Sequence, residues 1–456
     1  MTRDVRQFAH LSFFSWAYSP WGDQMESIWQ KTCAIPEFPS LQQDMKTDIL
    51  IVGGGLAGLL CAYRLDEQGA DYCLIEENRI CSGVSANTTA KITAQHGLVY
   101  HKLLSSFGAD TALDYYDANI NALACYRALS KKIDCDFREE ENVVWNSEKP
   151  GEVLLERKAL EQLEIPHFYL EKVPLNVPCQ GAICFEKQAR VHPLKFAAAI
   201  SEGLHIFEHT SAFEIRPNSV WTGKHTIHAN RIVVTTHFPV LKWRGLFFLK
   251  QYQSRAYALA LENAGKISGM YLDEAKKGLS FRMQGEYLIL GGGGHRTGKK
   301  GGGWDVLEEY AKSYLPNARI AARWATQDCM TLDEIPYIGR LSGQTDTLFV
   351  STGFNKWGMT SAMAGALLLE KMLRGEESPW ERLYDPSRSI LCRQLVVNGM
   401  EAAANLLRPT APRCTHMGCA LHWNKQEQSW DCSCHGSRFD EKGRLLDNPS
   451  QKDLNI

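Results

Sequence analysis

The sequence has no long apolar run and no excess of charge of one sign. Its richest apolar stretch, residues 365–373, is interrupted by Glu370 and Lys371, so we expect no transmembrane span. Lysine plus arginine number 50 and aspartate plus glutamate 52, which gives a net charge of −2. This balance argues against a nucleic acid or an anionic membrane recognised through bulk charge.

The sequence also has no apolar signal-peptide core near its start and no disulfide framework. Of its 14 cysteines, ten are scattered between residues 33 and 392 without regular spacing. Such cysteines are typical of buried or free thiols in a reducing compartment. We therefore expect a cytoplasmic protein, and the length of 456 residues favours two or three folded units.

A nucleotide-binding motif follows the first clear strand. The apolar residues 48–52 lead directly into Gly53, Gly55 and Gly58, a helical pattern runs to residue 68, and a second strand over 72–75 ends at Glu76. These glycines permit the tight turn, the approach of a pyrophosphate and close helix packing, and the acid, 23 residues after Gly53, suits a ribose hydroxyl. The amides of Leu56 and Ala57 open the helix whose N-terminus attracts phosphate.

The same motif serves FAD and NAD, and later segments favour FAD. Residues 333–339 and 351–360 resemble the C-terminal flavin segment of the D-amino-acid oxidase and glycine oxidase superfamily, and residues 87–96 fall where that family has its isoalloxazine loop. The resemblance implies that these three segments contact FAD. The residues expected to do so are Thr88, Thr89, Lys91, Gly339, Gly353, Trp357, Gly358, Met359 and Thr360. Helix capping is an equally simple role for the two threonines.

No second dinucleotide motif occurs, so we expect an organic substrate to be oxidised directly at the flavin. In the same superfamily, an arginine three residues before a turn glycine binds the substrate carboxylate, and the resemblance assigns this catalytic position to Arg282. A solvated or ion-paired arginine at a strand edge is the alternative. Residues 293–300 nearly spell an ATP-binding loop, but Lys300 occupies the position that needs Ser or Thr, so we expect no ATP site.

Two short stretches near the C-terminus each pair a cysteine with a histidine. Cys414 and His416 form the first pair, and Cys432 and His435 form the second. Structural zinc sites usually pair Cys with Cys and His with His, although the same four residue types could hold zinc. The order here resembles a Rieske site, in which a [2Fe-2S] cluster has two cysteine and two histidine ligands.

This resemblance implies that Cys414, His416, Cys432 and His435 bind iron and that Cys419 and Cys434 clamp the two loops. Ser437 matches a family position that donates a hydrogen bond to the cluster. Respiratory relatives have tyrosine where this chain has Phe439, so we expect a lower reduction potential. Because only about 25 residues separate the linker from Cys414, where a full Rieske domain has several more strands, we also expect the module to dock on residues 1–385 for cover.

We therefore predict an α/β fold, with a Rossmann-like FAD-binding domain, an antiparallel-sheet substrate domain and a small all-β Rieske module. The expected units are an extension over residues 1–46, the interleaved flavin domain over 47–385 and the Rieske module over 386–456. Besides the strands named above, we expect strands over 232–235, 287–290 and 348–351, and helices over 22–30, 194–202, 304–314 and 360–373.

The predicted function is a flavin-dependent dehydrogenase for a small amine, amino-acid-like or hydroxyl substrate. Its electrons would pass singly through the cluster to an external partner such as a ferredoxin or a quinone. Two alternatives stay open: a ferredoxin-fed reductase in which the cluster is the inlet, and a non-enzymatic redox sensor.

Overall fold

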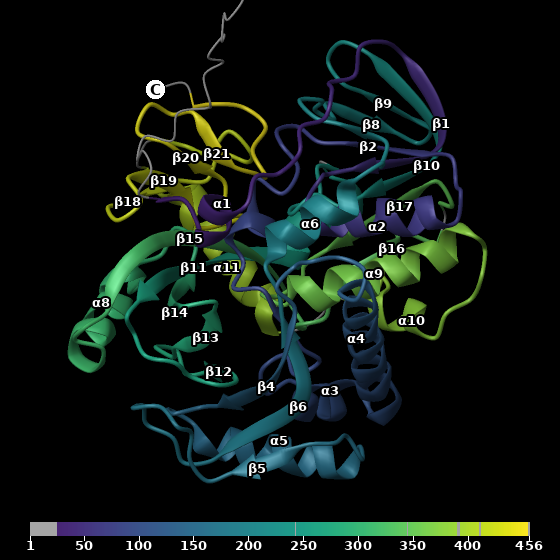
Figure 1. Cartoon of the computed structure of the whole chain (residues 1–456). Helices are drawn as coiled ribbons and strands as arrows, with labels where there is room; N and C mark the ends of the chain where they lie inside the picture. The colour runs from purple at the N-terminus through teal and green to yellow at the C-terminus, as the bar shows by residue number, and fades with distance from the viewer. Residues whose placement is uncertain (1–24, 242, 344, 390–392, 410–411, 455–456) are drawn as a thin grey trace, which may run out of the picture.

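The computed structural model describes residues 25–241, 243–343, 345–389, 393–409 and 412–454. Two large sheets and one small sheet organise these residues (Figure 1). The first sheet has the order β16-β17-β10-β1-β2-β7, and β1 (Met45–Val52) lies parallel to both β2 (Tyr72–Ile75) and β10 (Thr226–Val234). The parallel core confirms the Rossmann-like expectation.

The remaining strands of this sheet come from distant segments. They are β7 (Ile206–Phe207), β16 (Tyr337–Arg340) and β17 (Leu348–Thr352), with β8 (Glu214–Arg216) and β9 (Ser219–Trp221) as a hairpin beside β10. Helix α2 (Leu56–Glu67) connects β1 to β2 and packs on α9 (Gly358–Leu373), which follows β17. Both helices are apolar on most of their surface, and α4 (Ala109–Leu129) covers α9 in turn.

The second large sheet carries the order β15-β11-β14-β13-β12-β4-β6-β3 and is mostly antiparallel. Its strands are β3 (Lys91–Ile92), β4 (Arg138–Trp145), β5 (Phe168–Leu170), β6 (Ala182–Arg190), β11 (Gln251–Glu262), β12 (Met270–Asp273), β13 (Ser280–Gln284), β14 (Tyr287–Arg296) and β15 (Arg319–Thr331). Because the chain alternates between the two large sheets, their facing apolar residues form one continuous core.

Shorter helices cover the edges of these sheets. They are α1 (Ile28–Thr32), α3 (Tyr100–Phe107), α5 (Pro150–Gln162), α6 (Pro193–Ser201), α7 (Phe247–Lys250), α8 (Gly303–Tyr314) and α10 (Trp380–Tyr384), with 3-10 turns η2 (Val84–Asn87) and η3 (Arg244–Leu246). The helix expected over 22–30 begins only at Ile28, where Ser27 forms a capping box with Gln30; residues 22–24 lie outside the described residues. The strand expected over 287–290 is longer, because its glycines pair with β11.

The C-terminal module has helix α11 (Arg393–Leu407) and a third sheet, β18 (Leu421–Asn424), β19 (Ser429–Cys432), β20 (Arg438–Phe439) and β21 (Leu445–Asp447). It has its own small core and lies beside β15 and β11 of the second sheet (Figure 1). The four-stranded antiparallel sheet agrees with the all-β fold predicted for the module, and helix α11 before it was not predicted.

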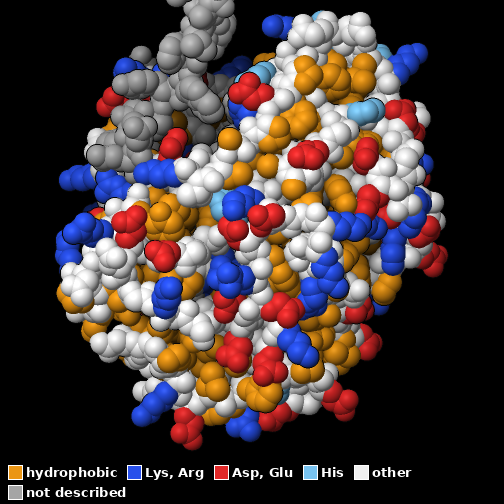
Figure 2. Space-filling model, in the orientation of Figure 1, with side chains coloured by type: hydrophobic (Ala, Val, Ile, Leu, Met, Phe, Trp, Pro, Cys, Tyr) orange, Lys and Arg blue, Asp and Glu red, His pale blue; other side chains and the backbone are white. Residues whose placement is uncertain are grey.

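Figure 2 shows acidic and basic side chains interspersed over one face of the molecule. This distribution matches the near-zero net charge of the sequence. Within the described ranges, every helix is too short or too polar to cross a lipid bilayer.

Candidate functional site

A deep cavity of about 1360 Å³ lies between the first and second sheets. Binding sites for drug-sized molecules occupy roughly 300–1000 Å³, so this space can hold a dinucleotide together with a small second ligand. Most of the predicted flavin-binding residues line it: Gly53, Gly55, Leu56, Ala57, Glu76, Thr88, Thr89, Lys91, Gly353, Trp357, Gly358 and Met359. Three others, Gly58, Gly339 and Thr360, do not line it.

The glycine turn has the geometry that a pyrophosphate needs. Gly53 has a φ of 113°, and a Cβ on Gly58 would come within 1.9 Å of the Gly53 carbonyl oxygen. Gly55 precedes α2 and has no side chain to cap it, while the Leu56 amide donates to the Ser85 hydroxyl at 2.9 Å. Gly55, Leu56 and Ala57 all line the cavity, so the helix N-terminus faces it. These features fit FAD, because the phosphates can accept hydrogen bonds from backbone amides there.

Glu76 ends β2 beside this turn. Its carboxylate accepts hydrogen bonds from the Gly54 amide at 2.7 Å and from the Asn78 amide at 2.9 Å. Burial raises the pKa of Glu76, and these two amides oppose the rise. Each carboxylate oxygen keeps a free lone pair, so the residue can still accept a ribose hydroxyl.

Two tryptophans fix the loop that was expected to lie along the flavin ring. The Trp29 indole donates to the Thr88 carbonyl at 2.8 Å, and the Trp324 indole donates to the Asn87 carbonyl at 3.0 Å. The hydroxyl of Thr88 accepts from the Ala90 amide, so it stabilises a turn while the residue lines the cavity. The extension residue Trp29 therefore positions this loop.

Lys91 and Glu274 are ionisable groups in the cavity wall, of which Lys91 is buried and Glu274 is half-buried. The Lys91 ammonium donates to the Tyr271 carbonyl at 2.7 Å and to the Ser280 hydroxyl at 2.8 Å. Burial, reinforced by Arg282, lowers the pKa of Lys91 to about 7. Burial raises the pKa of Glu274 to about 7, against the opposing charge of Lys102. Both groups can therefore exchange a proton near neutral pH.

The glycine-rich segment after β17 returns to the cavity as expected. Asn355 and Lys356 are both in the left-handed region, with φ of 50° and 72°, which allows a sharp turn before α9. Trp357 stacks on His96 with ring centroids 4.9 Å apart. His96 hydrogen-bonds with the Tyr115 hydroxyl at 2.6 Å and with the Thr360 hydroxyl at 2.8 Å. Thr360 therefore positions His96, which lines the cavity, without lining the cavity itself.

Arg282 does not reach the cavity. Its side chain is fully buried, lies over Trp29, and donates to Gln284 at 3.0 Å and more weakly to the carbonyls of Ala90 and Val191. The Arg-x-x-Gly spacing placed Arg282 on the correct strand, but the guanidinium points into the protein. The expected role of Arg282 as a carboxylate clamp is therefore wrong, because its guanidinium does not face the cavity. The solvated alternative is also wrong, because the side chain is buried.

The two Cys/His loops, residues 414–419 and 432–437, converge in the C-terminal module. The sulfurs of Cys419, Cys432 and Cys434 lie within 4.8 Å of one another, and Cys414 hydrogen-bonds with Cys432. The His416 and His435 rings are 5.0 Å apart. All four cysteines are free thiols, so the Cys419–Cys434 clamp stays a prediction.

These loops fit an iron-sulfur cluster. His416 Nδ1 is buried without a hydrogen-bond partner in the described structure, as expected of an atom that binds a metal. Burial lowers the pKa of His435 to about 3, which keeps its imidazole neutral, and metal binding requires the neutral form. Ser437 hydrogen-bonds with Cys414, in agreement with its expected role as a donor at the site.

The flavin domain covers the loops, as the shortness of the module led us to expect. Phe238 and Phe248 lie edge-on to His416 and His435, with ring centroids 6.3 and 6.1 Å apart. Arg296 lines the cavity and donates to the carbonyls of Ser433 at 3.1 Å and Cys434 at 3.4 Å. One side chain therefore joins the cavity to the second Cys/His loop.

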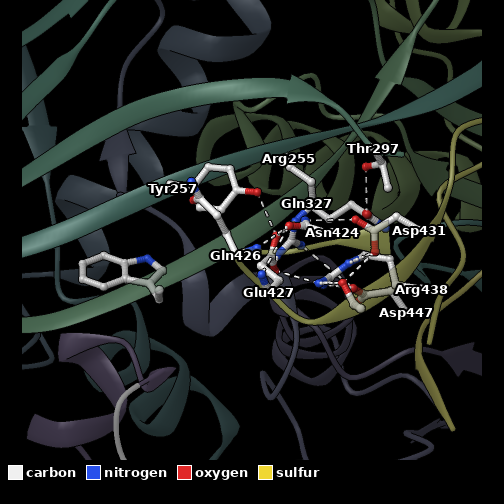
Figure 3. Close-up of polar contacts among 12 residues, drawn as sticks. Arg255, Tyr257, Thr297, Gln327, Asn424, Gln426, Glu427, Asp431, Arg438 and Asp447 are labelled. Atoms are coloured by element: carbon white, nitrogen blue, oxygen red, sulfur yellow. Dashed lines mark hydrogen bonds and ion pairs between the residues drawn. The ribbon is translucent and has the colours of Figure 1, made fainter. Parts of the chain in front are cut away.

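A buried ionic network also joins the flavin domain to the C-terminal module (Figure 3). Glu427, in the turn between β18 and β19, binds Arg255 and accepts a hydrogen bond from Tyr257 at 2.9 Å. Arg438 binds the same carboxylate at 2.7 Å and also binds Asp431 and Asp447. Fixed docking of the module follows from these contacts.

Sequence reasoning missed this network, Glu274 and the cavity-lining part of the C-terminal segment. Glu427 belongs to a polar hairpin turn of ordinary composition, so only its burial marks it. The near ATP-binding loop contained a usable signal: Gly298 has a φ of 73°, and a Cβ there would come within 2.5 Å of the Ser433 amide. Gly298 therefore allows the flavin domain to approach Ser433 of the C-terminal module closely.

Comparison with known proteins agrees with both parts of the fold. A family model described as FAD dependent oxidoreductase matches residues 48–372, and one described as Rieske [2Fe-2S] domain matches residues 388–456. YhfW of Bacillus subtilis (strain 168), named as a Rieske 2Fe-2S iron-sulfur protein, is 32% identical over 94% of this chain and 97% of its own length.

Two further proteins are similar to the flavin domain. The glycine oxidase structure from Geobacillus kaustophilus superposes with a TM-score of 0.65 at 20% identity, covering 76% of this chain and 99% of that one. Gamma-glutamylputrescine oxidoreductase of Escherichia coli (strain K12) is 23% identical over 74% of this chain and 86% of its own. The chain therefore belongs to the family of FAD-dependent oxidoreductases and carries, after its flavin domain, a Rieske domain for a [2Fe-2S] cluster.

Proposed function

We propose that this oxidoreductase is a dehydrogenase that oxidises a small amine or amino-acid-like substrate, or a hydroxyl substrate, in the cavity. When bound, FAD supplies two-electron chemistry and the cluster supplies one-electron transfer. The electrons would leave to an external acceptor such as a ferredoxin or a quinone. The observation that carries the proposal is Arg296, which lines the cavity and hydrogen-bonds to the second Cys/His loop.

The cavity wall supports a cationic substrate group. Glu274 and Glu334 both line it; Lys102, which also lines it, pairs with Glu334 at 3.0 Å, so Glu274 is the one of these two acids without an ion pair among the described residues. Neither arginine among the described lining residues is free to bind a carboxylate in place of Arg282. Arg296 is bound to Asn398 and the loop carbonyls, and Arg79 is paired with Glu37 and Glu208. An amine is therefore the favoured substrate class, and the similarity to gamma-glutamylputrescine oxidoreductase supports it.

The chain offers two groups that can take the proton released on oxidation. Glu274 and Lys91 both line the cavity, and burial brings the pKa of each to about 7. A general base works best with a pKa near the working pH. We assign Glu274 this role first, because both hydrogen bonds described for Lys91 tie its ammonium to the protein wall.

The test is anaerobic addition of amines, amino acids and hydroxy acids to the holoprotein. A substrate should bleach the visible flavin spectrum, and the signal of the reduced cluster should then appear in electron paramagnetic resonance. If no donor bleaches the flavin while reduced ferredoxin reduces the cluster and then the flavin, the cluster is an inlet and the reductase alternative holds. No turnover in either direction would favour the redox sensor.

We also propose the division into residues 1–46, 47–385 and 386–456, which the two matched family segments and the separate third sheet support. The iron ligands are proposed to be Cys414, His416, Cys432 and His435. A cytoplasmic location is proposed because the cysteines that the structure describes in the flavin domain are all free thiols.

A further inference from the structure

One part of the cavity wall comes from the Rieske domain. Residues 445–448 and 451–453, which begin with β21, line the same continuous space as the glycine turn of the flavin domain. Across this space lie residues 77–79, directly after the ribose-binding position Glu76, and residues 210–213, before β8. A dinucleotide in the cavity is therefore enclosed by both domains.

Hydrogen bonds tie this segment to both Cys/His loops. The Thr415 hydroxyl, between Cys414 and His416, donates to the Lys452 carbonyl at 2.8 Å and also hydrogen-bonds with Ser450. The Ser450 amide donates to the Ser437 hydroxyl at 3.0 Å, two residues after His435. Ser450 and Ser437 are both buried, so water does not compete for these bonds.

The segment is also closed on itself. The Leu445 amide donates to the Asp453 carboxylate at 2.8 Å, and the Leu454 amide donates to the Gly443 carbonyl at 2.8 Å. Leu454 is buried in the same small core as Cys414 and Cys432. A disturbance of the cluster loops would therefore be transmitted to the cavity wall.

Two side chains of this segment are available to a ligand. These are Gln451 and Lys452. Both residues are exposed and line the cavity, and none of the residues described forms a hydrogen bond or an ion pair with their side chains. Lys452 is a cation in the wall of a site for a ligand with a doubly charged diphosphate, and such charge-assisted contacts are strong. Gln451 adds a neutral donor.

We propose that residues 445–453 of the Rieske domain complete the FAD site, and that FAD and the [2Fe-2S] cluster thereby strengthen each other's binding. The inference rests on the two cofactors and not on the substrate. Coupling of this kind is reciprocal, so each cofactor must change the affinity of the other by the same factor.

The first test measures FAD dissociation from the full-length protein by the fluorescence of released FAD. Lys452→Glu should raise the dissociation constant at least tenfold while the cluster signal is retained. The matched control is Lys442→Glu, an exposed lysine in the same domain that does not line the cavity, and its affinity should equal that of the unchanged protein. Equal affinities in the two variants would overturn the contribution of the segment.

The second test removes iron with a chelator under reducing conditions and repeats the measurement on protein whose circular dichroism is unchanged. FAD should bind at least fivefold more weakly, and FAD-free protein should bind iron more weakly by a similar factor. An unchanged FAD affinity after iron removal would refute the coupling, whatever the effect of Lys452→Glu.

Discussion

The carboxylate of Glu427 binds the guanidinium of Arg255 across the boundary between the Rieske and flavin domains, with both side chains buried. Arg438 holds the same carboxylate from within the Rieske domain, so one acid is shared by two buried cations. Burial alone would raise the pKa of Glu427, but the two arginines lower it to about 2. This contact joins the two domains, and removing any one of its three side chains would leave a buried charge without a full set of partners.

Glu427→Gln should destabilise the docked state by about 3–5 kcal/mol, the usual cost of breaking a buried ion pair. Because the pKa of Glu427 is depressed by folding, this stability is present above about pH 4.5 and is lost as pH falls toward about 2. Denaturant unfolding and limited proteolysis between the domains measure the effect. The exposed Glu441→Gln is the matched control, and equal stabilities of the two variants would show that the contact contributes nothing.

Glu274→Gln should change the pH dependence of kcat/KM for an amine substrate. With a pKa of about 7, Glu274 is protonated below neutral pH and becomes a base as pH rises, so kcat/KM should increase through pH 7. The variant should lose most of its rate and the inflection. Glu286→Gln, an exposed acid outside the cavity, should keep both. An unaltered profile in Glu274→Gln would transfer the role to another group.

Lys91→Met should flatten the dependence of stability on pH. Folding lowers the pKa of Lys91 from 10.5 to about 7, so between these values the unfolded chain binds a proton that the folded chain does not. Stability therefore rises with pH in that window, by up to about 1.4 kcal/mol per unit from this one group. Urea unfolding at several pH values tests this, with the exposed Lys172→Met as control. The same slope in both variants would mean that Lys91 is not buried as a neutral amine.

Phe439→Tyr should raise the reduction potential of the cluster. Phe439 is fully buried in the small core with Cys414 and Cys432, where a phenol could donate a hydrogen bond to a ligand sulfur. A hydrogen bond to a charged group contributes about 1.5 kcal/mol, which corresponds to roughly 65 mV for one electron. Ser437→Ala should lower the potential. A titration followed by electron paramagnetic resonance in which Phe439→Tyr leaves the midpoint unchanged would contradict the argument.

Arg282→Met should leave KM within about twofold and lower thermal stability, because the guanidinium bonds only to the protein interior. Steady-state kinetics and a melting curve separate the two effects. A tenfold or larger rise in KM, confined to substrates with a carboxylate, would restore the clamp that the sequence spacing indicated.

The sequence by itself determined the elements whose chemistry is local. Gly53, Gly55 and Gly58 specify a strand, a turn and a helix within one short segment, and the Cys/His pairs place their ligands on two tight loops. The strands over 72–75 and 348–351 were predicted within one residue because their apolar runs are short and clearly bounded. FAD and the cluster followed from these motifs together with the family resemblance.

Only the tertiary structure decided what lies between distant segments. The spacing around Arg282 fixes its strand but not which face of the sheet meets the cavity. In the structure, the Arg282 side chain lies on the face that points into the protein interior. The burial of Glu427 depends on Arg255, 172 residues earlier, and the entry of residues 445–453 into the cavity wall depends on docking of the whole domain. Local patterns encode turns and faces, whereas these relationships arise from the packing of surfaces whose complementarity no short stretch of sequence displays.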